Sequence, residues 1–544
     1  MPGSGGVAHR TPVDLRTRRA RLASLAPLAL AACLLAAWLI VDPRTPDLAA
    51  QVYRVGLFRQ LGFAIWDEHW YAGHHLPGYS LLFGPLGALL GVRLLAAVSV
   101  LASTLLFERL VRSAFGAAAS WGACLLAVAA VADVWAGRLT FALGVTMALA
   151  AALAFAREHP LGAGALAAAC AAASPVAGVL LGLAALTLSL SQRSPRALVV
   201  LALPGAVVLG ALAALFPEGG FEPYPLVSFA ATALVVLAFL AALPPGAGRL
   251  RWGGALYLAT CVLCLLVHSP IGSNIERYGV LLAAPLLLSA WLAAHSEGLA
   301  RVGPRQLAVL VPALAASLTW VVWGPVRETL AVSGSPATSA AYYAPVERFL
   351  TGRRAAGPVR LEVPLTRTHW EAALLAPKVS LARGWEKQLD SRFDQALLSR
   401  SLDARSYDAW LHREAVAYVA LPDVPLDPSS AREGRLIRAG LPFLTPVFAS
   451  AHWRIFSVAS ATPLASGPGR LTRLGHESFT LLARSAGRFL VRVHFSRYLT
   501  LTRGRGCVGA AAEGWTAVTV KEAGTAVISA RFSLARALSS GAAC

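Results

Sequence analysis

The sequence changes composition abruptly near Trp323, and this change constrains the fold more than any other feature. Before that residue, long apolar runs alternate with short turns; after it, the chain is rich in Arg, with Asp and Glu interspersed. Of the 544 residues, 56% are hydrophobic and 14% are charged, and the mean hydropathy is +0.60. Because soluble proteins rarely reach such values, we predict a polytopic α-helical membrane core that carries a water-facing C-terminal domain.

The formal net charge of +20 does not indicate a nucleic-acid partner. Nucleic-acid-binding modules gather Lys and Arg on a soluble surface, with aromatic residues between them. Here much of the Arg lies in short turns between apolar runs, as the positive-inside rule for membrane proteins requires. The partner predicted from composition is therefore the lipid bilayer, and no nucleic acid is expected.

The first apolar run, residues 22–41, is long enough to cross a bilayer and follows a basic tail at residues 1–21. This order predicts a cytoplasmic N-terminus. A cleaved signal peptide is the competing interpretation, but no small-residue cleavage site follows the run. Further apolar runs bring the prediction to about eleven crossings of the cell membrane. They occupy residues 92–110, 115–135, 139–156, 160–174, 176–191, 197–216, 225–243, 253–268, 279–295 and 306–323.

An odd number of crossings places the C-terminal domain outside the cell, and the distribution of Arg favours this orientation. Every turn predicted to be cytoplasmic is basic; these turns contain Arg109, Arg112, Arg157, Arg193, Arg196, Arg249, Arg251, Arg301 and Arg305. The prediction depends on Ser174-Pro175, which must divide residues 160–191 into two helices. A single kinked helix there would reverse the orientation.

Two modules are predicted after the membrane core of residues 22–324. Residues 325–462 mix helical and strand patterns and predict a small α/β domain, whereas residues 463–544 contain alternating runs broken by Gly-rich turns and predict a β-sandwich. The clearest elements are helices at residues 344–350 and 407–413 and strands at residues 359–363, 416–421, 489–495, 516–521 and 526–532. Cys507 and Cys544 lie in the last module, where an oxidising exterior would allow them to pair.

The ionisable residues of the membrane core lie at the helix ends that are predicted to be external. Asp133, Arg138, Glu276 and Arg277 occupy such positions, and the first outer loop, residues 42–78, is rich in acidic, basic and His residues. An ion-coupled transporter generally needs ionisable groups near the middle of the bilayer. The observed pattern instead favours a site at the outer membrane surface, suited to a substrate with a lipid tail and a polar head.

Several residues of the outer face have both a functional and a structural interpretation. Asp42 and Asp47, stiffened by neighbouring prolines, suit a general base, ligands for a divalent cation or a solvated turn in which Asp47 caps an interfacial helix at residues 48–61. His74 and His75 suggest a metal site, although adjacent His residues rarely point to one ion. Arg277-Tyr278 fits a phosphate fork or interfacial snorkelling, and residues 81–90 suit a re-entrant segment.

Four segments carry a family resemblance: residues 46–51 (PDLAAQ), 71–80 (YAGHHLPGYS), 136–141 (AGRLTF) and 382–390 (ARGWEKQLD). With the predicted topology, they resemble the GT-C superfamily of membrane glycosyltransferases, which use polyprenyl-phosphate sugars. More narrowly, they look like a group of actinobacterial membrane proteins similar to YfhO-like and pyruvoyl-tetrahydropterin-synthase-related proteins.

The resemblance implies a fold, a reaction and a set of site residues. The catalytic first-loop carboxylate of the superfamily maps best onto Asp47, with Asp42 second. This chain lacks the adjacent Asp-Glu pair that some members carry there, and the nearest such pair, Asp67-Glu68, lies downstream. The partners implied are a polyprenyl-phosphate-linked sugar and a cell-envelope glycan or lipid acceptor. No cofactor is identified, and a divalent cation is left open.

The leading hypothesis is sugar transfer at the outer face. Asp47 would accept the proton of the acceptor, Arg138 and Arg277 would neutralise the lipid phosphate, and the loop of His74 and His75 would shape the cavity. The remaining candidate substrate contacts are Tyr278, Asp67 and Glu68. Trp385, Trp410 and Trp453 are either sugar-stacking platforms or core residues.

A non-catalytic protein of cell-envelope assembly and a lipid or glycan transporter are the alternatives. The sequence contains no P-loop, no His-Glu-x-x-His and no Gly-x-Ser-x-Gly, so ATP-driven and common hydrolytic chemistry lack support.

Overall fold

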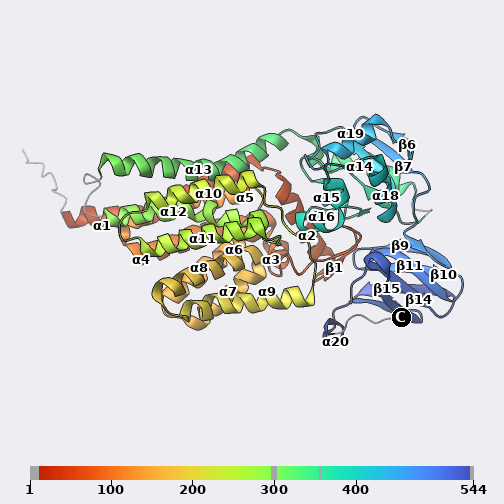
Figure 1. Ribbon diagram of the computed structural model, residues 1–544, viewed down its shortest axis with the longest axis horizontal. Helices are drawn as coiled ribbons and strands as arrows, with labels where there is room; N and C mark the ends of the chain where they lie inside the picture. Colours follow the sequence, from red (N-terminus) through yellow and green to blue (C-terminus); the bar gives the residue numbers. More distant parts are fainter. Residues whose placement is uncertain (1–11, 296–302, 354–356, 539–544) are drawn as a thin grey trace, which may run out of the picture.

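The computed structural model describes residues 12–295, 303–353 and 357–538. It has a long helical part and, at one end of it, two C-terminal modules that contain all but the shortest strands (Figure 1). Part of the predicted basic tail (residues 1–11), Arg301 and Cys544 lie outside the described residues. The predicted pairing of Cys507 with Cys544 therefore stays a prediction.

Each apolar run of the sequence forms a helix. The helical part contains α1 Pro12–Val41, α4 Val92–Phe115, η1 Ala117–Trp121 continued by α5 Gly122–Trp135, α6 Leu139–Ala156, α7 Pro160–Ala173, α8 Pro175–Gln192, η2 Leu198–Ala202 continued by α9 Leu203–Leu215, α10 Leu226–Ala242, α11 Gly248–Leu266, η3 Gly272–Ile275 continued by α12 Glu276–Ala294, and α13 Pro304–Val332. Within the described ranges, nine of these helices are long and apolar enough to cross a membrane, and α7 and α10 are shorter. The polytopic helical fold is confirmed, while the count of eleven crossings stays a prediction.

The division between α7 and α8 falls at the predicted position. Ser174 has an extended backbone and its side chain accepts a hydrogen bond from the Ala177 nitrogen, while Pro175 takes the first position of α8. A residue before proline avoids the helical conformation, and proline at the first helical position loses no hydrogen bond. Residues 160–191 therefore form two helices, as the predicted orientation requires.

Helix α13 is longer than predicted. The apolar run ends at Trp323, but the helix continues through Pro325 to Val332. Its last turns are fixed from outside, because the indole nitrogen of Trp135 donates to Thr329 Oγ1 at 2.9 Å. The change in composition therefore marks the end of the hydrophobic surface and not the end of the helix.

The first outer loop forms α2 Pro46–Leu61 and the antiparallel strands β1 Trp66–Asp67 and β2 His74–His75, and α3 Phe83–Leu90 follows it. The helix predicted at residues 48–61 is thus present, while its position at the membrane interface stays a prediction. Its cap differs from the prediction: Thr45 precedes the helix, Pro46 takes its first position, and Asp47 lies within the first turn. The Asp47 side chain therefore does not cap the helix. The membrane insertion expected for residues 81–90 stays a prediction.

The α/β module is built on a five-stranded sheet in the order β4-β3-β5-β7-β6. Strands β4 Ser380–Leu381, β3 Arg360–Glu362 and β5 Val416–Pro422 are parallel, and β7 Trp453–Val458 and β6 Leu444–Ala449 are antiparallel. The helices of this module are α14 Ala340–Thr351, α15 Glu371–Leu374, α16 Lys387–Phe393, α17 Gln395–Leu398, α18 Ala404–Arg413 and α19 Ala431–Ala439.

The last module consists of two four-stranded antiparallel sheets, in the orders β12-β15-β10-β9 and β13-β14-β11-β8. Its strands are β8 Ala465–Ser466, β9 Gly469–Leu474, β10 Ser478–Ala483, β11 Gly487–His494, β12 Leu499–Arg503, β13 Gly506–Ala510, β14 Trp515–Val520 and β15 Gly524–Ala530, followed by the short α20 Leu534–Ala537. Phe479 and Ile528 of one sheet share a core with Phe489 and Val518 of the other. This arrangement is the β-sandwich that the alternating runs predicted.

Both modules contact the same ends of the membrane helices. The Gln388 side chain donates to Pro270 O at 3.0 Å, and Tyr498 Oη donates to Leu215 O at 2.8 Å. The first outer loop also contacts the α/β module, since the indole nitrogen of Trp370 donates to Arg44 O at 3.1 Å. The loops that were predicted to be external thus meet at one end of the helices, beneath the C-terminal modules.

Candidate active site

A cavity of about 730 Å³ lies where the helix ends meet the α/β module, within the size range of small-molecule sites. One wall is apolar and comes from α8, α9 and α12; it includes Val176, Leu209, Leu212, Ala213, Phe216 and Val280. The other walls carry charged side chains from α2, the start of α6, the loop between α9 and α10, α12, α13 and the α/β module; these are Asp47, Arg138, Glu218, Glu222, Glu276, Arg277, Arg327, Glu328, Arg367, Glu386, Lys387 and Asp427. The cavity therefore suits a molecule with an apolar and a polar part.

Asp47 and Arg138 meet at this cavity because two chain segments pack backbone against backbone. Gly137 has a φ of +87°, and a Cβ there would come within 2.4 Å of the Leu48 nitrogen. Only glycine allows this approach, which fixes Arg138 beside the first turn of α2. The Arg138 Nε lies 3.7 Å from Asp47 Oδ2, and its Nη1 lies 3.8 Å from Asp133 Oδ1.

The Asp47 carboxylate is held by charge alone. The distance of 3.7 Å to Arg138 is that of an ion pair and exceeds the length of a hydrogen bond. Within the described part of the chain, no side chain or backbone group donates a hydrogen bond to it. Its side chain is 35% exposed. The oxygens of Asp47 are therefore free to accept a proton or a hydrogen bond from a ligand.

Three guanidinium groups of the cavity have no carboxylate within 4 Å among the residues that the structure describes. They belong to Arg277 of α12, Arg327 of α13 and Arg367 of the α/β module. Arg277 is positioned by an aromatic ring, since its guanidinium lies 5.3 Å from the centre of the Phe141 ring. Guanidinium groups without a carboxylate partner are suited to bind phosphate through paired N–H donors.

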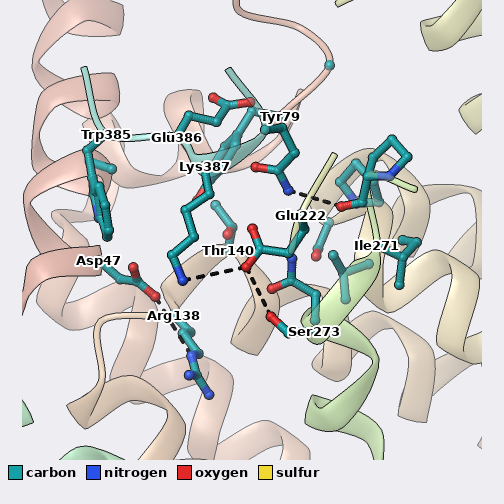
Figure 2. Close-up of a pocket in the computed structure, with 18 of the residues that line it drawn as sticks. Asp47, Tyr79, Arg138, Thr140, Glu222, Ile271, Ser273, Trp385, Glu386 and Lys387 are labelled. Carbon is teal, nitrogen blue, oxygen red and sulfur yellow. Dashed lines mark hydrogen bonds and ion pairs between the residues drawn. The ribbon is translucent and has the colours of Figure 1, made fainter. Parts of the chain in front are cut away.

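Lys387 reaches into the cavity from the α/β module, and Figure 2 shows its amine between Asp47 and Glu222. Its Nζ lies 3.5 Å from Glu222 Oε1, which also accepts a hydrogen bond of 3.0 Å from Ser273 Oγ. The Glu222 carboxylate raises the pKa of Lys387. The amine therefore stays protonated at neutral pH and adds a positive charge beside Asp47.

The two adjacent His residues point in different directions, because neighbouring residues of a strand face opposite sides. His75 lines the cavity; its Nδ1 lies 2.9 Å from Glu218 Oε1 and its Nε2 lies 3.0 Å from Ser496 Oγ. His74 is buried and stacks on Trp70. The structure therefore does not bring the pair together at one ion.

Four further predicted site residues do not line the cavity. Asp42 forms ion pairs with Arg44 and Arg93, and Tyr278 packs against Tyr257 with 5.3 Å between ring centres. Asp67 and Glu68 are fully buried. A contact with another side chain, or burial beneath the C-terminal modules, keeps each of these four side chains out of the cavity.

The environments of Asp67 and Glu68 explain their position. Asp67 accepts hydrogen bonds from Tyr53 Oη at 2.6 Å, from the ring of His476 in the β-sandwich at 2.9 Å and from the His69 nitrogen at 3.1 Å. Burial and the neighbouring Asp67 raise the pKa of Glu68 well above its usual range. These two carboxyl groups belong to the junction between the first loop and the C-terminal modules.

Of the three candidate tryptophans, two lie in the core and one lines the cavity. Trp410 and Trp453 are core residues whose indole nitrogens donate to Asp394 Oδ1 at 3.1 Å and to Tyr342 O at 2.7 Å. Trp385 lines the cavity.

Neither Lys387 nor Glu222 was predicted from the sequence. Lys is rare, since it is present only at three positions in the chain, and this rarity was the one available signal for Lys387.

No group of three or more His, Cys, Asp or Glu side chains able to hold a metal ion occurs in the described ranges. The divalent cation that the sequence left open has no further support.

Comparisons with known proteins match no family model and no curated protein. Among solved structures, the chain is similar to the arabinofuranosyltransferase AftD from Mycobacteria, with 14% identity and a TM-score of 0.45 over 95% of this chain and 57% of AftD. It thus spans little more than half the length of AftD.

ArnT from Cupriavidus metallidurans matches over 80% of this chain and 98% of its own. The identity is 15% and the TM-score 0.43 for the apo state, against 14% and 0.44 for the state bound to undecaprenyl phosphate. At this level of similarity the function has to be argued from the cavity itself.

Proposed function

We propose that this protein is an integral membrane glycosyltransferase that transfers a sugar from a polyprenyl-phosphate donor to a cell-envelope acceptor. The observation that carries the proposal is that Asp47, Arg138 and Arg277 line one cavity together with apolar side chains of α8 and α9. These residues come from three different helix ends, far apart in the sequence. A carboxylate, guanidinium groups and an apolar wall in one space are what a lipid-phosphate sugar requires.

The lipid part of the donor would lie along α8 and α9. Few residues of α9 are buried within the protein, so its outer surface is available to the bilayer. Arg277, which has no carboxylate partner among the described residues, would bind the phosphate. Arg138 and the ammonium group of Lys387 would add positive charge where the leaving phosphate develops its negative charge.

Asp47 would act as the general base. It takes the proton of an acceptor hydroxyl while that oxygen attacks the anomeric carbon of the sugar. The bond from this carbon to the phosphate oxygen breaks, and the lipid phosphate leaves with the electron pair. The carboxylates of Glu222 and Asp427 are already occupied, by Lys387 and by His369 respectively. Asp47 accepts no hydrogen bond from the described residues, and it occupies the first-loop position at which the sequence places the base, so it is the candidate.

The membrane orientation is part of this proposal. The cavity and the C-terminal modules lie at the end of the helices opposite to the basic turns at Arg157, Arg193 and Arg249. The positive-inside rule assigns the basic turns to the cytoplasm. The cavity would then open at the outer face of the cell membrane, with the N-terminus inside.

The direct test uses the purified full chain in lipid nanodiscs. Native mass spectrometry with undecaprenyl phosphate should detect a bound lipid, and Arg277→Gln should weaken binding about tenfold, the loss expected for one charge-assisted contact. Arg93→Gln, at an arginine outside the cavity, is the matched control and should bind as the wild type does. Failure to bind the lipid phosphate, or equal effects of both variants, would exclude the proposed donor site.

A further inference from the structure

The α/β module forms one side of the cavity, beside Asp47. Three of its residues line this side: Arg367, Trp385 and Asp427. Figure 2 shows the indole ring of Trp385 directed toward Asp47. An aromatic ring, a guanidinium group and a carboxylate therefore lie on the side from which an acceptor would approach the proposed base.

One face of the Trp385 ring is already covered. The imidazole ring of His369 stacks on it, with 3.5 Å between ring centres and an angle of 17°. His369 is buried, whereas Trp385 still lines the cavity. The indole is thus fixed from behind and remains available to a ligand in the cavity.

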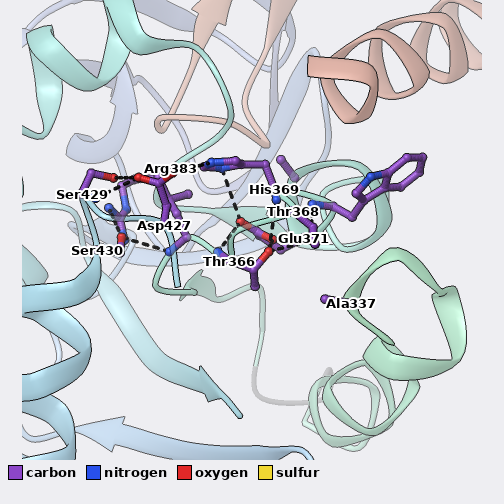
Figure 3. Close-up of polar contacts among 12 residues, drawn as sticks. Ala337, Thr366, Thr368, His369, Glu371, Arg383, Asp427, Ser429 and Ser430 are labelled. Atoms are coloured by element: carbon purple, nitrogen blue, oxygen red, sulfur yellow. Dashed lines mark hydrogen bonds and ion pairs between the residues drawn. The ribbon is translucent and has the colours of Figure 1, made fainter. Parts of the chain in front are cut away.

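His369 is itself held by a polar cluster, which Figure 3 shows. Its Nε2 lies 3.3 Å from Asp427 Oδ2 and its Nδ1 lies 3.8 Å from Glu371 Oε1. Asp427 also accepts hydrogen bonds from the Ser429 nitrogen at 2.8 Å and from Ser429 Oγ at 2.7 Å. Thr366 Oγ1 donates to Glu371 Oε2 at 2.6 Å.

The backbone at His369 is unusual as well, with a φ of +54°. A non-glycine residue rarely adopts the left-handed region, and it persists there only where surrounding contacts fix it. Here the contacts with Asp427, Glu371 and Trp385 provide that support. The cluster therefore holds a strained residue in the one position from which its ring supports the tryptophan.

The chain on either side of Trp385 is equally constrained. Gly384 packs on Trp70 so closely that a Cβ would lie 2.4 Å from the indole ring. Arg383 forms buried ion pairs with Glu362 and Glu433. On the other side, Glu386 pairs with Arg54 of α2. Such rigidity is unnecessary for a surface tryptophan and is typical of a preorganised binding residue.

We infer that Trp385, Asp427 and Arg367 form a carbohydrate-binding subsite, so that the acceptor of the proposed transfer is a glycan and not a lipid or a protein side chain. A sugar ring combines an apolar face, which packs on an aromatic ring, with hydroxyl groups that bond to carboxylate and guanidinium groups. The subsite would present an acceptor hydroxyl to Asp47. This inference rests on the proposed function.

The subsite is tested by binding of soluble sugars to the full chain in nanodiscs. The probes are three neutral trisaccharides, mannotriose, cellotriose and chitotriose, followed by saturation-transfer NMR. At least one should bind, and Trp385→Ala should weaken its binding by at least tenfold, with a smaller loss in Trp385→Phe. Trp252→Ala, at an exposed tryptophan of α11 outside the cavity, is the matched control and should leave binding unchanged.

His369 is a positioning residue, and its variants separate positioning from folding. His369→Phe keeps a ring against Trp385, whereas His369→Ala removes it. In a transfer assay with the bound trisaccharide, His369→Ala should raise the KM for the acceptor about tenfold with little change in kcat, and His369→Phe should restore most of the affinity. Acrylamide quenching of tryptophan fluorescence should increase in His369→Ala, because the uncovered indole becomes accessible.

The outcomes distinguish this inference from the proposed function. Sugar binding that depends on Trp385, with undecaprenyl phosphate binding intact, supports the subsite. The subsite is overturned if none of the trisaccharides binds, or if Trp385→Ala binds them as well as the wild type does. In that case, lipid binding that Arg277→Gln weakens would leave the proposed donor site standing; loss of both ligands would remove both proposals.

Discussion

The first outer loop holds carboxyl groups in two opposite settings. Asp47 is 35% exposed, faces a cavity and is held only by a charge 3.7 Å away. Asp67 lies twenty residues further along the chain, is 0% exposed and accepts hydrogen bonds from Tyr53, His69 and His476. Both are acidic residues of one loop, yet Asp47 accepts no hydrogen bond from the described residues, whereas Asp67 accepts three.

The difference shows how one loop serves two purposes. The buried group ties the loop to the β-sandwich, because its His476 contact crosses between the two. The exposed group is then presented on the first turn of α2 at a fixed position, since Gly137 packs against Leu48. A rigid, satisfied junction allows an unsatisfied carboxylate to be held where a substrate can reach it.

Replacing the exposed group should have the largest effect. Asp47→Asn removes the proposed base but keeps the shape of the side chain, so transfer should fall about 10²- to 10⁴-fold, as expected for loss of a general base. The thermal unfolding temperature should change little, because Asp47 makes no hydrogen bond with the described residues. The measurement is transfer of a radiolabelled sugar from a polyprenyl-phosphate donor in nanodiscs. Retention of full activity would favour a non-catalytic role in envelope assembly.

The buried group should behave in the opposite way. Asp67→Asn places an amide where Tyr53 Oη and the His476 ring both need an acceptor. Loss of hydrogen bonds to a buried carboxylate should cost about 2–4 kcal/mol of unfolding free energy, while the activity of the protein that remains folded stays near the wild-type value. Thermal unfolding and specific activity, measured on one preparation, separate the two effects. If Asp67→Asn has normal stability but low activity, Asp67 takes part directly in sugar transfer.

Much of the fold followed from local sequence. Helix α6 begins and ends where residues 139–156 were predicted to, because Arg138 and Arg157 bound its apolar run. Ser174-Pro175 separated two short helices through proline sterics alone. The end of α13 was missed, since hydropathy reports the extent of the apolar surface and a helix can continue beyond it.

The candidate site was only partly accessible to such reasoning. Asp47, Arg138 and Arg277 line one cavity, and the sequence related them because all three lie at helix ends with the same predicted orientation. Their roles stay a proposal. Trp385 and Lys387 join them through the docking of a separate module, which depends on distant contacts such as Gly384 against Trp70. No local pattern contains that information.

A half-buried imidazole of the β-sandwich extends the comparison to the pH dependence of stability. His494 stacks between Phe393 and Trp515, with ring centres 4.2 and 4.5 Å apart. Burial and repulsion by Arg360, Arg392 and Arg413 lower its pKa to about 3. His494 is therefore neutral in the folded protein and takes up a proton on unfolding below its ordinary pKa of about 6.5.

The sign of the pH effect follows from this depressed pKa. The stability is fully present above about pH 6.5 and falls as the pH decreases toward 3, by about 2–3 kcal/mol at pH 4.5. His494→Phe keeps the stacked ring and removes the titration, so its unfolding temperature should decrease less between pH 7 and pH 4.5 than that of the wild type. Parallel pH profiles for the two proteins would show that His494 does not titrate in this range.

The smallest effect is expected for a third carboxylate of the same loop. Asp42 is 49% exposed and pairs with Arg44 and Arg93 at the surface. Because exposed ion pairs contribute about 0–1 kcal/mol, Asp42→Asn should shift the unfolding temperature by at most a few degrees and should leave sugar transfer within about twofold of the wild type. Thermal unfolding measures the first effect, and the nanodisc transfer assay measures the second. If Asp42→Asn instead loses as much activity as Asp47→Asn, lining the cavity does not distinguish the two carboxylates. Both Asp42 and Asp47 would then be required for sugar transfer.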